Sequence, residues 1–436
     1  MTDFFEKYLF KSVSAWPLIT LRVAFGVLMT FGALRFWYYG WIEELYIKPN
    51  FHFQYFGLEL PTLSEAGMYF VFMLFVLLSI LFTLGFYFRI VAPLLFITFC
   101  YIELIDVSTY LNHYYFVSIV LFFFCFVPAA RMFSMDALRA RNSASREVPA
   151  WTINIFLLQI GIVYFFAGLA KLHSDWLLEA LPLKLWLPAR AHLPLIGSLL
   201  EKPIAAYIFS WAGCIYDLSI PFILLYKPTR FIGYLTVIAF HILTWILFPI
   251  GIFPWVMIVM TLAFFPPAAH AQFWRRYIPA EGTTQSEPPR NKKLVSAMVV
   301  LFFTIQILLP LRFIVQSENL FWDELGFRFS WRVMLMEKSG DVQFRVSDTC
   351  GHSYIVEPSQ QLTKLQYTQM STQPDLILQY AHHIAKLNSR DCAVTSIHAE
   401  SYVSLNGRGS RPFIDPAVNL LEVTDNGDRL TWLMPY

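Results

Sequence analysis

The run INIFLLQIGIVYFFAGLAK, residues 153–171, decides the fold class of this chain. Only Asn154 and Gln159 interrupt its apolar and aromatic side chains before it ends at Lys171. A helix of this length crosses the roughly 30 Å of a bilayer's hydrocarbon core. Helices and closed barrels are the structures that satisfy every backbone hydrogen bond inside lipid. The run therefore predicts a membrane-spanning helix with a charged side chain at one end.

The composition extends this prediction to most of the chain. Of the 436 residues, 57% are hydrophobic, 18% are aromatic and 14% are charged, and the mean hydropathy is +0.53. A soluble domain carries roughly a quarter of charged residues. The net charge of +2 is too small to indicate a nucleic-acid partner. We therefore expect an integral membrane protein whose main surroundings are the lipid bilayer.

Further apolar runs long enough, or nearly long enough, to span a membrane recur up to residue 315. They lie at 17–37, 67–87, 90–106, 113–129, 153–171, 205–226, 231–248, 251–266 and 294–314. We predict an all-α polytopic membrane bundle of eight or nine transmembrane helices over residues 1–315. The sixth to eighth runs are crowded and allow for a re-entrant pair.

The basic residues predict the orientation of the bundle. With nine spans, the basic loops fall on one side of the membrane, which the positive-inside rule makes cytoplasmic. The residues concerned are Lys7, Lys11, Arg89, Arg131, Arg139, Arg141, Arg146, Lys227, Arg230, Arg275, Arg276, Arg290, Lys292 and Lys293. The chain after about residue 315 then lies on the extracytoplasmic side, together with Asn112, His113 and Lys171.

From residue 316 to 436 the composition is that of a small extracytoplasmic α+β domain. Residues 342–346 and 353–357 alternate like the strands of a hairpin, and residues 372–387 form an amphipathic helical pattern. Residues 281–291 look like a flexible linker before the last span. Cys350 and Cys392 are the cysteines outside the spans, on the oxidising side, and the sequence leaves a disulfide or two free thiols open.

Several polar side chains interrupt the spans and indicate a site. Burial of Lys171 disfavours its charged form, and a neutral amine takes a proton from a weak acid; the alternative is that the amine only reaches the interface. Asn112 and His113 begin a helix on the same side and are suited to hold an oxyanion. Asp217 and His241 lie deeper in their spans. The sequence carries no metal or cofactor motif, so redox chemistry would need a lipid-soluble quinone.

The stretch VYFFAGLAKLHSDW, residues 163–176, resembles the VYFIAGVKKLDADW motif of the vitamin K-dependent γ-glutamyl carboxylases. Other similar segments follow in the same order along nearly the whole chain. They are Phe88–Ile90, Asp106 with Asn112, His113 and Tyr115, Val148–Trp151, Asp217–Ser219, Phe240–His241, Ile250–Phe253, Ser330–Trp331 and Phe413–Pro416. The chain is similar to the bacterial members, called horizontally transferred transmembrane domain (HTTM) proteins.

The resemblance implies a coupled reaction in a bacterial inner membrane. Lys171 would deprotonate reduced vitamin K or menaquinol, with Asn112, His113 and His241 as further catalytic residues. Oxygen would convert the quinol anion to a strong base that takes a glutamate γ-proton, CO2 would add to the carbanion, and the quinone would leave as an epoxide. Asp106, Tyr115, Asp217 and Trp331 are the expected substrate or quinone contacts. The expected partner is a glutamate-containing protein.

The chain also departs from the family pattern. Ala170 replaces a lysine, His173 replaces an acidic residue, and Met336 stands where the family has a histidine. The C-terminal domain is expected to be truncated relative to the animal enzymes. These departures leave two alternatives: an enzyme of the same fold that uses quinol without carboxylating glutamate, and a non-catalytic membrane protein.

Overall fold

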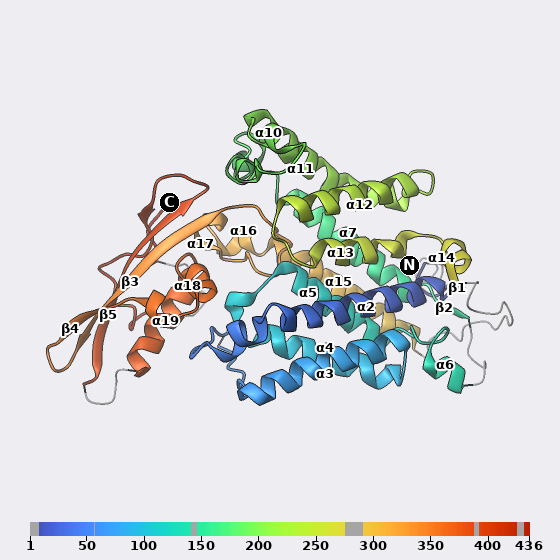
Figure 1. Cartoon of the computed structure of the whole chain (residues 1–436), viewed down its shortest axis with the longest axis horizontal. Helices are drawn as coiled ribbons and strands as arrows, with labels where there is room; N and C mark the ends of the chain where they lie inside the picture. The colour runs from blue at the N-terminus through green and yellow to red at the C-terminus, as the bar shows by residue number, and fades with distance from the viewer. Residues whose placement is uncertain (1–7, 56, 141–145, 275–290, 388–391, 425–430) are drawn as a thin grey trace.

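The computed structural model describes residues 8–55, 57–140, 146–274, 291–387, 392–424 and 431–436. A bundle of long helices occupies one part of the molecule, and a sheet with two covering helices occupies the other. Figure 1 shows the N-terminus at the far end of the bundle and the C-terminal sheet at the opposite end. The predicted order of a helical bundle followed by an α+β domain is confirmed.

The bundle consists of long helices joined by short helical turns. The long helices are α2 (Trp16–Tyr38), α3 (Glu65–Leu84), α4 (Phe88–Leu104), α5 (Asn112–Phe126), α7 (Trp151–Leu169), α11 (Pro203–Leu225), α12 (Arg230–Leu247), α13 (Phe253–Thr261), α14 (Pro267–Trp274) and α15 (Lys292–Leu308). The short helices are η1 (Glu43–Ile47), η2 (Val107–Thr109), α6 (Met135–Arg139), α8 (Ser174–Leu177), α9 (Leu183–Trp186), η3 (Pro188–Arg190), α10 (Gly197–Leu200), η4 (Leu262–Phe264), η5 (Leu309–Leu311), α16 (Phe313–Gln316) and α17 (Leu320–Asp323).

The structure contains fewer candidate spans than the eight or nine predicted transmembrane helices. Within the described residues, six helices are long and apolar enough to cross a membrane, or seven if one bent pair is a single span. Helices α4 and α5 have only 17 and 15 residues, below the roughly 20 that a full crossing needs. The bent pair joins Phe253–Phe264 to Pro267–Trp274 at 109°, because Pro266 and Pro267 interrupt the run. A broken segment in this crowded region was among the expectations.

The described basic residues of the predicted cytoplasmic loops lie at the N-terminal end of the bundle. Strand β1 (Ser12–Ser14) pairs with β2 (Glu147–Pro149), and Arg131 donates to the Glu147 carbonyl at 2.8 Å. Lys292 lies 5.6 Å from the centroid of the Phe10 ring. The turn from α11 to α12 is at this end as well (Figure 1). The positive-inside rule therefore assigns the opposite end, with the C-terminal domain, to the extracytoplasmic side.

The C-terminal domain is built on a four-stranded antiparallel sheet of order β4-β3-β5-β6. Its elements are β3 (Lys338–Asp348), β4 (Ser353–Val356), η6 (Pro358–Gln360), α18 (Lys364–Met370), α19 (Pro374–Leu387), β5 (Val394–Leu405) and β6 (Arg411–Pro412). The predicted hairpin is confirmed, with Val346 opposite Tyr354. The predicted helix is confirmed from Pro374 onward. The expected linker over 281–290 lies outside the described residues, and Asn291 caps α15.

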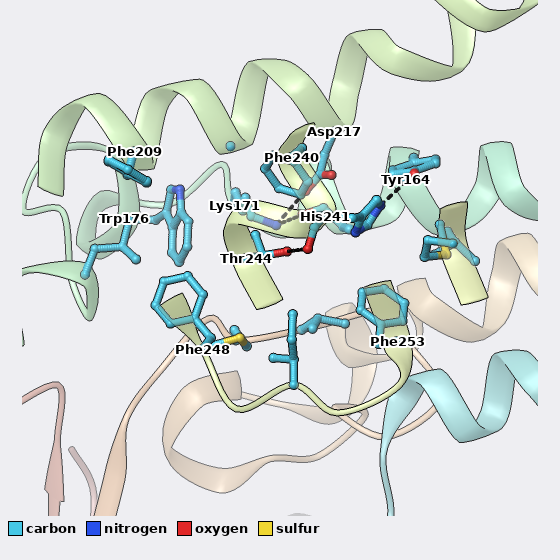
Figure 2. Close-up of a pocket in the computed structure, with 18 of the residues that line it drawn as sticks. Tyr164, Lys171, Trp176, Phe209, Asp217, Phe240, His241, Thr244, Phe248 and Phe253 are labelled. Carbon is cyan, nitrogen blue, oxygen red and sulfur yellow. Dashed lines mark hydrogen bonds and ion pairs between the residues drawn. The ribbon is translucent and has the colours of Figure 1, made fainter. Parts of the chain in front are cut away.

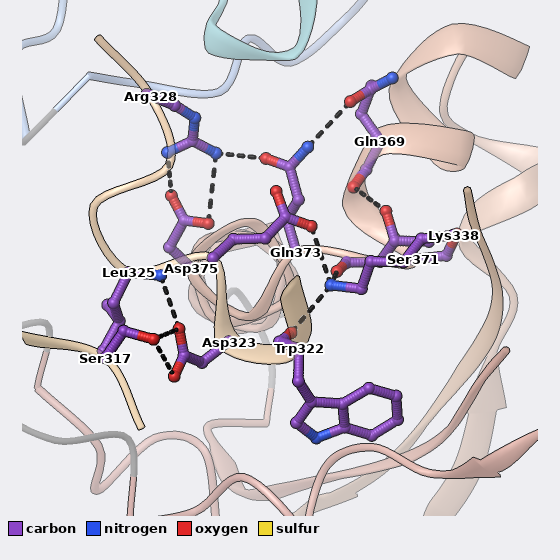
Figure 3. Close-up of polar contacts among 12 residues, drawn as sticks. Ser317, Trp322, Asp323, Leu325, Arg328, Lys338, Gln369, Ser371, Gln373 and Asp375 are labelled. Atoms are coloured by element: carbon purple, nitrogen blue, oxygen red, sulfur yellow. Dashed lines mark hydrogen bonds and ion pairs between the residues drawn. The ribbon is translucent and has the colours of Figure 1, made fainter. Parts of the chain in front are cut away.

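The segment between the last long helix and the sheet is fixed by polar contacts (Figure 3). The Asp323 carboxylate accepts hydrogen bonds from Ser317 Oγ and the Leu325 amide, each at 2.8 Å. Arg328 pairs with Asp375 at 2.6 Å, and Lys338 Nζ donates to the Trp322 carbonyl at 2.8 Å. Such charge-assisted hydrogen bonds hold a segment without regular structure in one conformation. Residues 317–338 thus form a defined connection over the end of the bundle.

Candidate functional site

A pocket of about 820 Å³, counted out to its open mouth, lies at the end of the bundle next to the C-terminal domain. Helices α7, α11, α12 and α13 form its walls, and Val333 and Met334 of the segment before the sheet complete it. Most of its lining is aromatic or aliphatic, including Trp176, Phe248 and Phe253 (Figure 2). Its polar side chains are Tyr164, Lys171, Asp217, His241 and Thr244. A mostly apolar cavity with a few polar groups is typical of small-molecule sites.

Lys171 and Asp217 form a buried ion pair in this pocket. Lys171 Nζ lies 2.7 Å from Asp217 Oδ2, and the side chains are 9% and 7% exposed. Nζ also donates to the Ala167 carbonyl at 3.2 Å, one of the carbonyls left free at the end of α7. The amine is therefore buried, as the sequence predicted, and it is paired with a carboxylate, which the sequence did not predict.

The pair forms because α7 and α11 approach closely at Gly168. A Cβ atom at Gly168 would lie 2.9 Å from the backbone nitrogen of Leu218 and 2.7 Å from its side chain. Such distances are well inside van der Waals contact, so glycine is required there. The close approach sets Asp217, the neighbour of Leu218, against the amine that follows the end of α7.

His241 is held from one side and unpartnered on the other. Its Nε2 lies 2.9 Å from Tyr164 Oη, which in turn accepts a hydrogen bond from Tyr216 Oη at 3.5 Å. Its Nδ1 is buried and has no partner among the described residues, and the whole side chain is 2% exposed. A buried ring nitrogen without a partner costs free energy unless a ligand meets it.

The structure does not bring Asn112 and His113 into the pocket lining. The His113 ring packs on Phe253, 5.6 Å between centroids, and Phe253 also contacts His241 at 5.9 Å. His113 is therefore separated from His241 by one aromatic ring, and its buried Nε2 has no partner in the part of the chain that the structure describes. Asn112 Nδ2 donates to the Arg332 carbonyl at 2.6 Å, so its amide joins α5 to the segment before the sheet.

Asp106, Tyr115 and Trp331 lie at the junction between the bundle and the C-terminal domain. The Asp106 carboxylate accepts from the Ser108 amide and from Gln366 Nε2, both at 2.8 Å. The Tyr115 and Trp331 rings stack at 4.9 Å. These contacts support the fold, and none of the three residues lines the pocket. Of the eight predicted site residues, the pocket thus holds Lys171, Asp217 and His241.

Tyr164, Trp176 and Thr244 are pocket residues that the sequence analysis did not select. Tyr164 stands seven residues before Lys171, which is two helical turns and so the same face of α7. Thr244 stands three residues after His241, again on one face. The helical spacing from Lys171 and His241 could therefore have identified Tyr164 and Thr244. Trp176 lies after the end of α7, so the helical spacing does not place it near Lys171. The fold of the loop brings the amine to 5.4 Å from its ring.

Cys350 and Cys392 form a disulfide, with Cα atoms 5.8 Å apart. Asp348 and His352 bring their side-chain ligand atoms within 4.8 Å of these sulfurs. Both sulfurs are used by the disulfide, which joins the β3–β4 turn to the start of the segment that leads into β5. Cys100, Cys125 and Cys214 lie inside helices and are free.

The bundle, its end-on pocket and the α+β domain define an integral membrane protein with a lumenal-type C-terminal domain. Residues 10–268, more than half of the chain, match the HTTM domain. Residues 291–436 match the lumenal domain of vitamin K-dependent gamma-carboxylase. The chain therefore belongs to the HTTM and vitamin K-dependent gamma-carboxylase family. No solved structure matches it.

Proposed function

We propose that this protein is a quinol-dependent, carboxylase-like membrane enzyme. Its substrates are reduced vitamin K or menaquinol, O2, CO2 and a peptide glutamate, and its membrane is a bacterial inner membrane. The observation that carries the proposal is the buried Lys171–Asp217 pair, at 2.7 Å, in an aromatic pocket that also holds an unpartnered His241 nitrogen. Ionisable groups inside a membrane protein are costly and rare, and those that occur mark functional sites.

The lining of the pocket suits the aromatic rings and the two hydroxyl groups of a fused-ring quinol. Trp176, Phe248 and Phe253 offer flat apolar surfaces, and Lys171 and His241 offer polar atoms for the two ring oxygens. The bound quinol would supply the electrons, and O2 would supply the added oxygen of the strong base and of the epoxide. The protein's part is to remove the first proton and to keep water away from the product of that step.

Lys171 becomes a base by passing its proton to Asp217. In a pocket of low polarity, two opposite charges are costly to desolvate, and their neutral forms avoid that cost. A proton shift from Nζ to Oδ2 across the 2.7 Å hydrogen bond leaves a neutral amine and a neutral carboxyl group. The neutral amine then accepts the hydroxyl proton of the quinol.

His241 stabilises the charge that this step leaves on the quinol oxygen. We infer that Tyr164 Oη, which lies 2.9 Å from His241 Nε2, donates its hydrogen to that nitrogen. The hydrogen of neutral His241 then resides on Nδ1, where it is free to donate to an oxyanion. Tyr164 is in this way a positioning residue, because it fixes which ring nitrogen carries the proton.

The first alternative, quinol chemistry without glutamate carboxylation, is favoured by one observation. Met336 stands at the position of the family histidine and packs against the core of the C-terminal domain. A thioether offers no acid or base, so the later proton transfers need another group or do not occur.

The test uses purified protein in lipid nanodiscs with reduced vitamin K or menaquinol, oxygen, labelled bicarbonate and a glutamate-rich peptide. Epoxide and fixed label are counted separately in the wild type and in Lys171→Ala. Both products in the wild type, and neither in the variant, support the carboxylase. Epoxide without label supports the first alternative. Neither product with either quinol refutes the catalytic proposal and leaves the non-catalytic membrane protein.

A further inference from the structure

Residues 183–200 connect α7 to α11 through three short helices, α9, η3 and α10. Side chains of this segment fasten it to the ends of two membrane helices. Lys184 Nζ donates to Tyr207 Oη of α11 at 2.9 Å, and Arg190 Nε donates to the Leu247 carbonyl at the end of α12 at 2.8 Å. The segment therefore has a fixed position on the bundle, with an inner and an outer face.

The two faces of the segment are both apolar. On the inner face, Leu187 and Leu200 are 0% and 2% exposed and pack in one cluster with the start of α11. On the outer face, Leu195 is 99% exposed and Leu199 is 54% exposed. Leu195 also has a φ of 71°, which a bulky side chain rarely adopts. A single exposed leucine is ordinary at a protein surface, so the neighbouring surface decides what these two contact.

The neighbouring surface is the lipid-facing side of α11. Ile204, Ile208 and Ile215 are 61%, 59% and 58% exposed, and their spacing of four and seven residues places them on one face of the helix. Helix α11 is a candidate span of 23 residues, about 34 Å long, so nearly all of it fits in a hydrocarbon core of roughly 30 Å. Lipid therefore covers this face up to the first turn of the helix, where Ile204 lies.

The outer face of the segment directly precedes that first turn. The Lys202 amide donates to the Leu199 carbonyl at 3.2 Å, which makes α10 and the start of α11 consecutive helical turns. Figure 1 shows α10 at the end of α11, at the edge of the bundle and apart from the C-terminal sheet. Glu201 and Lys202 between the two helices are exposed. Such charges at the end of a span reach the headgroup region, so α10 lies at the boundary of headgroups and acyl chains.

We propose that residues 183–200 form an interfacial segment whose outer face, Leu195 and Leu199, lies among the acyl chains of the leaflet on the side of the C-terminal domain. The ligand is phospholipid, because this face continues a surface that lipid already covers. The same segment contributes Leu183 and Trp186 to the pocket lining, so one wall of the pocket is anchored in the leaflet. The contact is independent of the proposed chemistry, since it requires lipid alone.

The test places a nitroxide spin label at Leu195→Cys or Leu199→Cys in protein whose Cys100, Cys125 and Cys214 are replaced by alanine, in phosphatidylcholine nanodiscs. The measured quantity is the ratio of collisions with O2, which concentrates in hydrocarbon, to collisions with a nickel chelate, which stays in water. Ile208→Cys on α11 is the lipid control. Ile355→Cys on β4, also apolar and 62% exposed, is the water control. Both loop labels should give a ratio several-fold above that at Ile355 and near that at Ile208.

The unaltered protein provides a second measurement that does not depend on folding of the variants. A phosphatidylcholine with a photoactivatable group near the carbonyl end of one acyl chain should label residues 183–200 and leave β4 unlabelled.

Two results would overturn the proposal. A collision ratio equal to that at Ile355, with no photolabel in the segment, places the outer face in water. Labels shielded from both reagents show that protein, such as a second copy of this chain, covers it. Because neither measurement needs turnover, the expected ratios in a protein without quinol activity would refute the proposed function alone.

Discussion

Asp175 accepts two hydrogen bonds from the Arg408 guanidinium, at 2.6 and 2.8 Å, and a third from Asn406 at 2.8 Å. Arg408 follows the Asn406–Gly407 turn at the end of β5, whereas Asp175 lies four residues after Lys171. The loop that follows Lys171 is thereby tied to the C-terminal domain. The pocket therefore depends on the docking of that domain, although most of its walls are membrane helices.

Removing this tie should loosen the loop more than it unfolds the protein. Both partners are partly exposed, at 36% for Arg408 and 21% for Asp175, so we expect Arg408→Gln to cost about 1 kcal/mol or less. Cleavage of the loop over 172–182 by added protease should nevertheless accelerate, because local opening needs less energy than unfolding. Arg345→Gln, in an exposed ion pair on β3 with Glu400, is the control. Unchanged cleavage rates would show that the tie does not hold the loop.

Variants of the Lys171–Asp217 pair should differ in how stability and activity respond: the double variant should recover stability but not activity. Lys171→Met or Asp217→Leu alone leaves one buried charge without a partner, which costs about 3–5 kcal/mol. The double variant Lys171→Met/Asp217→Leu should regain most of that stability, since both charges are gone. Quinol turnover should fall at least 100-fold in all three. Denaturant unfolding in detergent micelles gives the stabilities. If the double variant loses as much stability as the two single variants together, the two side chains are not coupled.

The sequence predicted the components of this fold better than their assembly. The apolar run at 153–171 and the alternation at 342–346 each specify an element through local periodicity, so both were placed well. The predicted and candidate span counts differ at α4 and α5, because an apolar run does not show where its helix will end. The disulfide was left open, since nothing in the spacing of Cys350 and Cys392 fixes their distance.

The site was predicted in part for the same reason. Lys171, Asp217 and His241 stand out as polar residues in apolar runs, and the pocket contains all three. Their partnership depends on the contact of α7 with α11 at Gly168, which is a tertiary feature. Asp106 and Asn112 stand out equally in the sequence, yet their hydrogen bonds join the bundle to the C-terminal domain. A polar residue in a span thus indicates a partner without indicating which one.

Acidification should weaken the loop through His173. The ring accepts a hydrogen bond from the Trp176 amide, and burial, with the charges of Arg332 and Lys171, lowers its pKa from 6.5 to about 4, against the opposing effect of Asp175. The unfolded state then binds a proton first as pH falls below 6.5, so stability declines from pH 6.5 to 4 and is constant above. His173→Asn keeps a cap acceptor and should remove this part of the slope. Equal slopes in unfolding experiments would refute the assignment.

Tyr164→Phe should test the proton placement on His241. The variant keeps the ring packing but removes the group that directs a hydrogen to Nε2, so both tautomers become populated. We expect turnover to fall about tenfold or more. The decrease should not exceed the rate loss caused by removing one oxyanion-hole donor. The distinguishing readout is the 15N chemical shift of the His241 ring in labelled protein, which should move from the Nδ1–H pattern to an average. An unchanged shift would show that Tyr164 has no such role.

Gly168→Ala should separate the helices that create the site. The added methyl group would approach the Leu218 backbone nitrogen to 2.9 Å, and backbone cannot move aside without shifting α11. Overpacking of this kind costs about 1–3 kcal/mol, and here it also lengthens the Lys171–Asp217 distance, so turnover should fall with stability. Gly161→Ala, on the same helix, is the matched control: its nearest neighbour is Pro221 Cβ at 4.0 Å. That variant should keep full activity and gain slight stability from its helix propensity. If both variants behave alike, close packing at Gly168 does not position the pair.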